Sequence, residues 1–161
     1  MTITRNYEHM KENTAKKNIT VNRKARYEYS IIQSYEAGIV LVGTEVKSLR
    51  QGKATIVDSY AKLSNGEVWL VNLHISEYTQ GNRNNHDPKR ERKLLLNKSE
   101  IRKLLSKTKD KGLTLIPLRL YFKKGKVKVE LALAKGKKVY DKRRDIAKRD
   151  FERDQERKVK Y

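Results

Sequence analysis

The stretch YAKLSNGEVWLV, residues 60–71, decides the fold class of this chain. Apolar and polar residues alternate on both sides of Asn65-Gly66, and this dipeptide between alternating segments is the strongest short-range signal for a β-hairpin. The alternation extends over residues 56–78. We therefore predict two antiparallel strands joined by a tight turn at Ser64-Asn65-Gly66.

The segments before this hairpin carry one strand signal and one helix signal. Residues 29–42 are rich in β-branched and aromatic side chains and are broken only at Glu36-Ala37-Gly38, which predicts two strand segments that meet at a bend or bulge. Residues 43–52 predict a short helix, with Thr44 as its N-cap and Gly52 in the left-handed position that ends it.

The segment after the hairpin predicts a loop and a second helix. Residues 80–93 are polar and contain turn-forming residues, so we expect a loop there. Asn97 is expected to cap a helix, because Glu100 lies three residues on, as in a capping box. The apolar stripe of this helix indicates one buried face, and Gly112 is expected to end it.

A second hairpin completes the expected fold, with strands over residues 113–122 and 127–134. Strands in this order, with one short and one longer helix between them, favour a mainly β protein with helices, built on a small antiparallel β-barrel of the oligonucleotide-binding (OB) type. We expect a mobile N-terminal arm over residues 1–18, a single barrel domain over residues 19–134 and a basic C-terminal tail over residues 135–161.

The positive charge of the chain is segregated. Among 161 residues, 39 are Lys or Arg and 19 are Asp or Glu, which leaves a formal net charge of +20. Residues 27–88 contribute −2 of this, and the rest of the chain contributes +22. Like charges gathered in this way repel one another unless an anionic partner neutralises them, so nucleic acid is the expected partner. The charged segments lack the bulky apolar face of a helix that binds at a membrane surface.

Several classes of protein are disfavoured by what the sequence lacks. No stretch approaches the roughly 20 apolar residues of a membrane span, and no apolar block of a signal peptide opens the chain, so we expect a cytoplasmic protein. There are no cysteines, and His9, His74 and His86 have no metal-ligand spacing. No phosphate-binding loop or nucleophile motif is present, so we expect no catalytic residue, metal or cofactor. Paired carboxylates that meet only in space remain possible.

The C-terminal tail has the composition of a segment that folds on its partner. It carries 12 basic and 6 acidic residues, with ion-pair spacing of four residues at Asp145 and Arg149 and at Asp154 and Lys158. Each such pair stabilises a helix by only about 0.2–0.5 kcal/mol. The tail has few large apolar residues, so we expect it to be largely disordered alone and helical when bound.

Seven short strings, in order along the chain, resemble the SsrA-binding protein family, also called small protein B. They cover roughly residues 20–150 with spacing similar to that of the family. The strings are NRKARYEY (22–29), EAG (36–38), GTEVKSLR (43–50) followed by GKA (52–54), DSY (58–60), DP (87–88), RKLLLN (92–97), and AKGKK (134–138) leading into DKR (141–143).

This resemblance implies an OB-type barrel with helices packed on it and a non-enzymatic role in trans-translation. Proteins of this family bind the transfer-RNA-like domain of transfer-messenger RNA (tmRNA, also SsrA). They bring its alanyl-charged form, with elongation factor Tu and GTP, into the vacant A site of a stalled ribosome, which is rescued while its peptide is tagged. The basic tail is then a helix in the empty mRNA channel, beyond the decoding centre of the small subunit. We expect a monomer that associates with ribosomes during rescue.

The resemblance also suggests which residues contact RNA. Family residues tied to RNA binding correspond to Glu36, Leu95 and Asn97. Asn97 could cap a helix, contact RNA or do both, whereas Leu95, between two other leucines, is more readily interpreted as a core residue than as an RNA contact. Glu36 is expected to accept hydrogen bonds from base amino groups or to position a neighbouring Arg. The remaining expected RNA-binding residues are Arg23, Lys24, Lys135, Lys137, Lys138, Tyr140, Asp141, Lys142 and Arg143.

The tail residues are expected to bind RNA in two ways. Its lysines and Arg143 would neutralise phosphate, whereas Tyr140 replaces a histidine common in the family and can still stack on a base.

Two alternative functions remain open from the sequence. One is a general ribosome-associated or single-strand-binding OB-fold protein, and the other is an RNA-processing enzyme such as a nuclease or methyltransferase.

Overall fold

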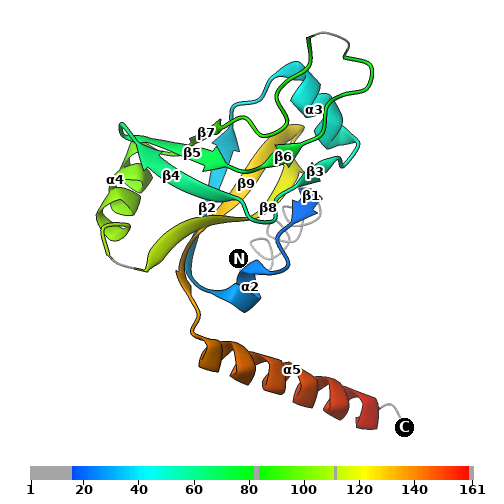
Figure 1. The fold of residues 1–161 in the computed structure, drawn as a ribbon, viewed down its shortest axis with the longest axis vertical. Helices are drawn as coiled ribbons and strands as arrows, with labels where there is room; N and C mark the ends of the chain where they lie inside the picture. Colours follow the sequence, from blue (N-terminus) through cyan, green and yellow to red (C-terminus); the bar gives the residue numbers. More distant parts are fainter. Residues whose placement is uncertain (1–15, 82–83, 111, 160–161) are drawn as a thin grey trace, which may run out of the picture.

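A computed structural model describes residues 16–81, 84–110 and 112–159. In chain order the elements are β1 (Lys16–Val21), α2 (Ala25–Glu28), β2 (Tyr29–Ile39), α3 (Gly43–Arg50), β3 (Ala54–Thr55), β4 (Tyr60–Ser64), β5 (Glu67–Val71), β6 (His74–Ile75), β7 (Arg92–Leu95), α4 (Lys98–Lys107), β8 (Leu113–Lys123), β9 (Lys126–Gly136) and α5 (Val139–Val159). Figure 1 shows α4 beside the strands, α3 near β3 and β6, and α5 projecting away below α2.

Six antiparallel strands pair in a ring, in the order β8, β4, β5, β7, β2, β9 and back to β8. The ring is not a strict barrel, because β2 and β7 are joined through two residue pairs and β4 and β8 through one, Ala61 with Leu115. The prediction of a mainly β fold with helices on an antiparallel, OB-type arrangement is confirmed.

Both predicted hairpins are confirmed, and their turns have the expected backbone. Asn65 and Gly66 between β4 and β5 have φ of 51° and 72°, and Lys124 and Gly125 between β8 and β9 have φ of 51° and 75°. Two successive positive φ angles give the turn a twist that matches the right-handed twist of the strands. Local sequence therefore determines both connections.

The predicted break in the strand at Glu36-Ala37-Gly38 is wrong. Strand β2 passes through these residues and pairs with β9 in regular register, with Glu36 opposite Glu130 and Gly38 opposite Lys128. The irregularity lies instead between Ile31 and Gln33. Pairing along nearly the whole of β9 outweighs the weak strand propensity of Ala and Gly.

Three further boundaries differ from the prediction. The N-cap of α3 is Val42, not Thr44, and Glu45 accepts a hydrogen bond from the Val42 N–H at 3.3 Å. Helix α4 ends at Lys107, before Gly112. The expected loop over 80–93 is too long, because β7 begins at Arg92.

The two ends of the chain also refine the prediction. Residues 1–15 of the expected arm, including His9, lie outside the described residues, whereas Lys16–Val21 forms β1 and pairs with β8. At the other end β9 continues to Gly136, beyond the expected domain boundary at 134.

The predicted tail helix is present as α5, in which no side chain is buried. Its expected disorder away from a partner stays a prediction. No helix in the described part of the chain has the length and apolar character needed to cross a membrane.

A buried ion pair joins α3 to β7. The side chains of Glu45 and Arg92 are both 0% exposed, and the Arg92 Nε donates to the Glu45 carboxylate. Arg92 also donates to the carbonyl oxygens of Leu73, at 2.7 Å, and Pro88, at 3.1 Å. Arg90 donates from Nε to Glu45 at 2.7 Å. Burial lowers the pKa of the Arg92 guanidinium, and the hydrogen bond and charge of Glu45 oppose this shift.

Breaking this pair should strongly destabilise the fold. Glu45→Gln leaves the Arg92 guanidinium buried without its counter-charge, and we expect unfolding in urea to require about 3–5 kcal/mol less free energy. A matched change in an exposed pair, Glu67→Gln beside Lys93, should cost at most about 1 kcal/mol. An equal loss of unfolding free energy in the two variants would show that the buried pair stabilises the fold no more than the other pair does.

Candidate nucleic-acid interface

The predicted RNA-binding residues lie on two surfaces near opposite ends of β2. Glu36 is near the end of the strand that pairs with β7, whereas Tyr29, at the other end, pairs with Gly136 where the tail begins. The seven steps along the strand from Tyr29 to Glu36 span about 23 Å at about 3.3 Å each. The structure therefore divides the predicted site into a barrel part and a tail part.

The barrel part is one pocket, which we call the barrel pocket. Strands β2, β7 and β9 and the start of α4 contribute to it. It brings together Glu36, Leu95 and Asn97, the three residues that the resemblance tied to RNA binding. Its lining is Glu36, Gly38, Leu95, Leu96, Asn97, Glu100 and Lys128.

Leu95 is an exposed residue of this pocket and not a core residue. Leu94 points into the core, so Leu95 points outward, and it is 51% exposed. It lies directly on Gly38, its partner across the strands, where a Cβ would come within 3.2 Å of the Leu95 Cβ. The absence of a side chain at Gly38 lets the leucine lie close against β2.

Asn97 occupies the N-cap of α4, as predicted. The Glu100 carboxylate accepts a hydrogen bond from the Asn97 backbone N–H at 3.3 Å. The first turn of α4 thus borders the pocket, and the positive end of its dipole favours an anion there. Contact between Asn97 and RNA stays a prediction, and its position as the helix cap is compatible with such a contact.

Glu36 is held in place by two side chains of β8. The Tyr121 hydroxyl donates to its Oε2 at 2.5 Å, and Lys123 Nζ donates to its Oε1 at 3.2 Å. These contacts, with the Tyr121 hydrogen bond first, hold the pKa of the Glu36 carboxyl below its usual value. Burial and Glu36 together raise the pKa of Tyr121, so its hydroxyl remains a donor.

The expectation that Glu36 positions a neighbouring Arg stays a prediction. The Arg119 guanidinium lies over the Tyr121 ring, 4.7 Å from its centroid, and Arg119 Nε donates to Glu130 at 2.5 Å. Lys16 lies on the same ring at 5.5 Å. The sequence alone does not show this network, because its members meet only through long-range strand pairing.

The tail part of the site, which we call the tail root, consists of Arg23 and Lys24 in the turn before α2 and of residues 135–143. Most of its charged side chains are exposed, as is Tyr140. Lys137 and Lys142 are half-buried, and both contact α2. The predicted phosphate contacts of the tail root stay predictions.

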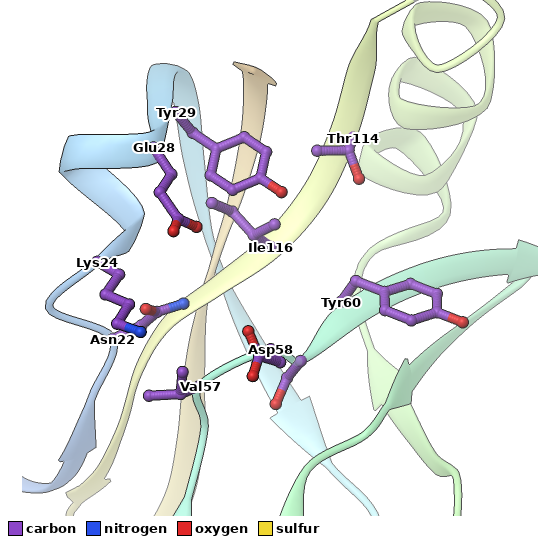
Figure 2. A pocket seen from close by; sticks show the side chains of 10 residues that line it. Asn22, Lys24, Glu28, Tyr29, Val57, Asp58, Tyr60, Thr114 and Ile116 are labelled. Carbon is purple, nitrogen blue, oxygen red and sulfur yellow. The ribbon is translucent and has the colours of Figure 1, made fainter. Parts of the chain in front are cut away.

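A second pocket, shown in Figure 2, lies between α2 and the segment that leads into β4. Lys24 and Glu28 lie along one wall, and Asp58 and Tyr60 along the other. Lys24 is the one predicted RNA-binding residue in its lining. The neighbouring Ser59 hydroxyl donates to the Asn72 carbonyl oxygen at 3.2 Å, so its role is structural.

His86 also has a structural role. It is buried between the Thr44 hydroxyl and the Ile75 carbonyl oxygen, with both contacts at 2.9 Å. Thr44 thus bonds His86 from within the first turn of α3.

Comparison with known proteins identifies the family. The model of the family described as SmpB protein matches residues 19–161. The chain belongs to this family. SmpB proteins bind RNA and are not enzymes, so the expectation of a non-enzymatic protein is confirmed and the alternative of an RNA-processing enzyme is excluded.

Individual relatives are similar in sequence to this chain along most of their length. An SsrA-binding protein of Desulforudis audaxviator is 67% identical over 138 residues, which is 86% of this chain and 90% of the relative. That of Rhodococcus jostii is 60% identical over 93% of this chain and 95% of the relative. A chain of a solved structure described as "tmRNA-SmpB: a journey to the center of the bacterial ribosome" is 54% identical, with a TM-score of 0.63 over 74% of this chain and 85% of that one.

Removing the Tyr121 hydroxyl should raise the pKa of Glu36. Because this pKa is depressed in the folded chain, the stability that the carboxylate contributes is present at neutral pH and is lost as the pH falls through the folded pKa. In Tyr121→Phe this contribution should be smaller and should be lost completely at a higher pH, and a carboxyl ¹³C NMR titration should show Glu36 becoming protonated at a higher pH. Tyr78→Phe is the control, since its hydroxyl donates to Gln80. An unchanged Glu36 titration in Tyr121→Phe would contradict the assignment.

Proposed function

We propose that the chain is the RNA-binding adaptor of trans-translation. It binds the transfer-RNA-like domain of tmRNA through the barrel pocket. With elongation factor Tu and GTP, it delivers the alanyl-charged RNA to the vacant A site of a stalled ribosome. The observation that supports this most directly is the gathering of Glu36, Leu95 and Asn97 in one pocket of a chain that belongs to the SmpB family.

The chemistry of the barrel pocket suits a folded RNA. The ionised Glu36 accepts hydrogen bonds from base amino groups, and Leu95 offers an apolar surface to a base or ribose. Lys128 and the N-terminus of α4 attract a phosphate. Acceptor, apolar surface and anion site in one small area favour recognition of a particular RNA shape over general attraction to the backbone.

The tail has the second part of the function. Helix α5 buries none of its side chains, and with the lysines that flank it the tail is net basic, so it suits a groove lined with RNA phosphate. On the ribosome it lies in the mRNA channel beyond the decoding centre and enters only when no mRNA is there. The protein acts as a monomer in the cytoplasm, with residues 16–136 as the RNA-binding barrel and the following residues as the tail.

Binding should be selective for the transfer-RNA-like domain and sensitive to salt. In gel shifts with a transcript of this domain, ordinary transfer RNA should compete poorly. Leu95→Asp places a negative charge in the pocket and should weaken binding about tenfold or more. Leu105→Asp, an exposed leucine of α4 outside the pocket lining, is the control. Equal affinity for any RNA would instead support a general ribosome-associated or single-strand-binding OB-fold protein.

Removing the tail should separate RNA binding from ribosome rescue. A chain that ends after Lys138 keeps the whole of β9, which pairs with both β2 and β8. We expect it to bind the transfer-RNA-like domain nearly as well as the full chain and to lose tagging of stalled peptides in a reconstituted translation assay. Loss of RNA binding in this truncation would contradict the division between barrel and tail.

A further inference from the structure

Lys137 makes three contacts within the protein, at the point where the tail leaves the barrel. Its backbone N–H donates to the Glu28 carbonyl oxygen at 2.9 Å, and its Nζ donates to the Arg26 carbonyl oxygen at 2.9 Å. The same Nζ donates to the carboxylate of Asp145. Its side chain is only 17% exposed, far less than expected of a lysine whose task is to meet phosphate.

The contact with Asp145 differs from the ion pairs within α5. Lys137 precedes the helix, whereas Asp145 lies in its second turn, so the pair joins the end of β9 to the body of the helix. Lys142, three residues before Asp145 and so on the same helix face, has its Nζ 5.9 Å from the centroid of the Tyr27 ring. The hydrogen bond from Lys137 is the first cause that holds the pKa of Asp145 below its usual value. One face of the first two turns therefore rests on α2.

The rest of α5 has little else to orient it. None of its side chains is buried, and Ile146 and Phe151 are exposed. A helix of this length extends about 30 Å at 1.5 Å per residue, so a tilt of about 20° at its root would move its tip by about 10 Å. Small changes at the root thus decide where the tip lies.

We propose that Lys137 and Asp145 form a clamp that sets the direction of the tail helix. Both are positioning residues: the clamp orients the first two turns of α5 against α2 before any partner is met. The importance of the direction of α5 for entry into the mRNA channel rests on the proposed function. Lys137 then differs in role from the exposed Lys135 and Lys138 beside it.

The direction of the helix can be measured in the free protein, because the chain has no cysteine to interfere with labelling. Spin labels at Ser64→Cys, in the exposed β4–β5 turn, and at Ala147→Cys, in α5, report the distance between barrel and tail by double electron–electron resonance. We expect a single narrow distribution in the free protein, which would overturn the expectation from the sequence that the tail is largely disordered alone. Asp145→Lys, which repels Lys137, should broaden or shift it, and Lys137→Asp with Asp145→Lys, which reverses the pair, should restore it.

Asp154→Lys is the matched control, since it makes the same charge change on α5 away from the clamp. It should leave the distribution unchanged. Circular dichroism of both single variants should show equal helix content, so that broadening reports direction rather than melting. Three results would overturn the clamp. They are a broad distance distribution in the labelled protein with Lys137 and Asp145 intact, no change in Asp145→Lys, and no recovery in the reversed pair.

Rescue assays connect the clamp to function. If Asp145→Lys leaves about one tenth of the tails in the productive direction, tagging of stalled peptides should fall about tenfold, while affinity for the transfer-RNA-like domain stays within about twofold. The reversed pair should recover tagging, and failure to do so with a restored distance distribution would overturn the functional role of the clamp. If the unaltered protein did not bind tmRNA, the proposed function would fail, yet the distance measurements would still decide whether the clamp exists.

Discussion

The buried pair of Glu45 and Arg92 is the constraint on which the barrel pocket depends. Arg92 opens β7, and its guanidinium is fixed by Glu45 and by two carbonyl oxygens. With Arg92 held inside, alternation along the strand places Leu94 in the core and Leu95 outside. A slip of one residue would exchange them and remove the apolar surface of the barrel pocket. An interaction deep in the fold therefore determines which side chain of β7 lines the pocket.

Closure of the ring has a similar effect on Glu36. Strands β2, β9 and β8 lie side by side, which lets Tyr121 and Lys123 reach the Glu36 carboxylate while Arg119 pairs with Glu130. The acceptor in the pocket is thus ionised and held in one orientation before RNA arrives. Such preorganisation lowers the entropy cost of binding and makes the site sensitive to the shape of its ligand.

Local signals made much of this fold predictable. Both hairpins and the cap of α4 follow from residues within a few positions of one another. The errors arise where a distant partner decides: β2 is unbroken because β9 pairs with it, and Arg92 is in a strand because Glu45 neutralises it. For the site, the resemblance could name Glu36, Leu95 and Asn97, but only the ring shows that they share a pocket. Tyr121 and Lys128 carried no sequence signal of their own.

The internal ion pairs show how the acidic side chains of this basic chain are used. Several of its few acidic side chains are engaged internally: Glu45 with Arg92, Glu130 with Arg119 and Asp145 with Lys137. Each of these pairs fixes a structural relation, between helix and strand, strand and strand, or tail and barrel. These three acidic residues thus shape the protein, while many lysines and arginines remain exposed. Because each pair engages one basic and one acidic side chain, the surface that a polyanion meets keeps the net positive charge of the chain and offers fewer carboxylates to oppose binding.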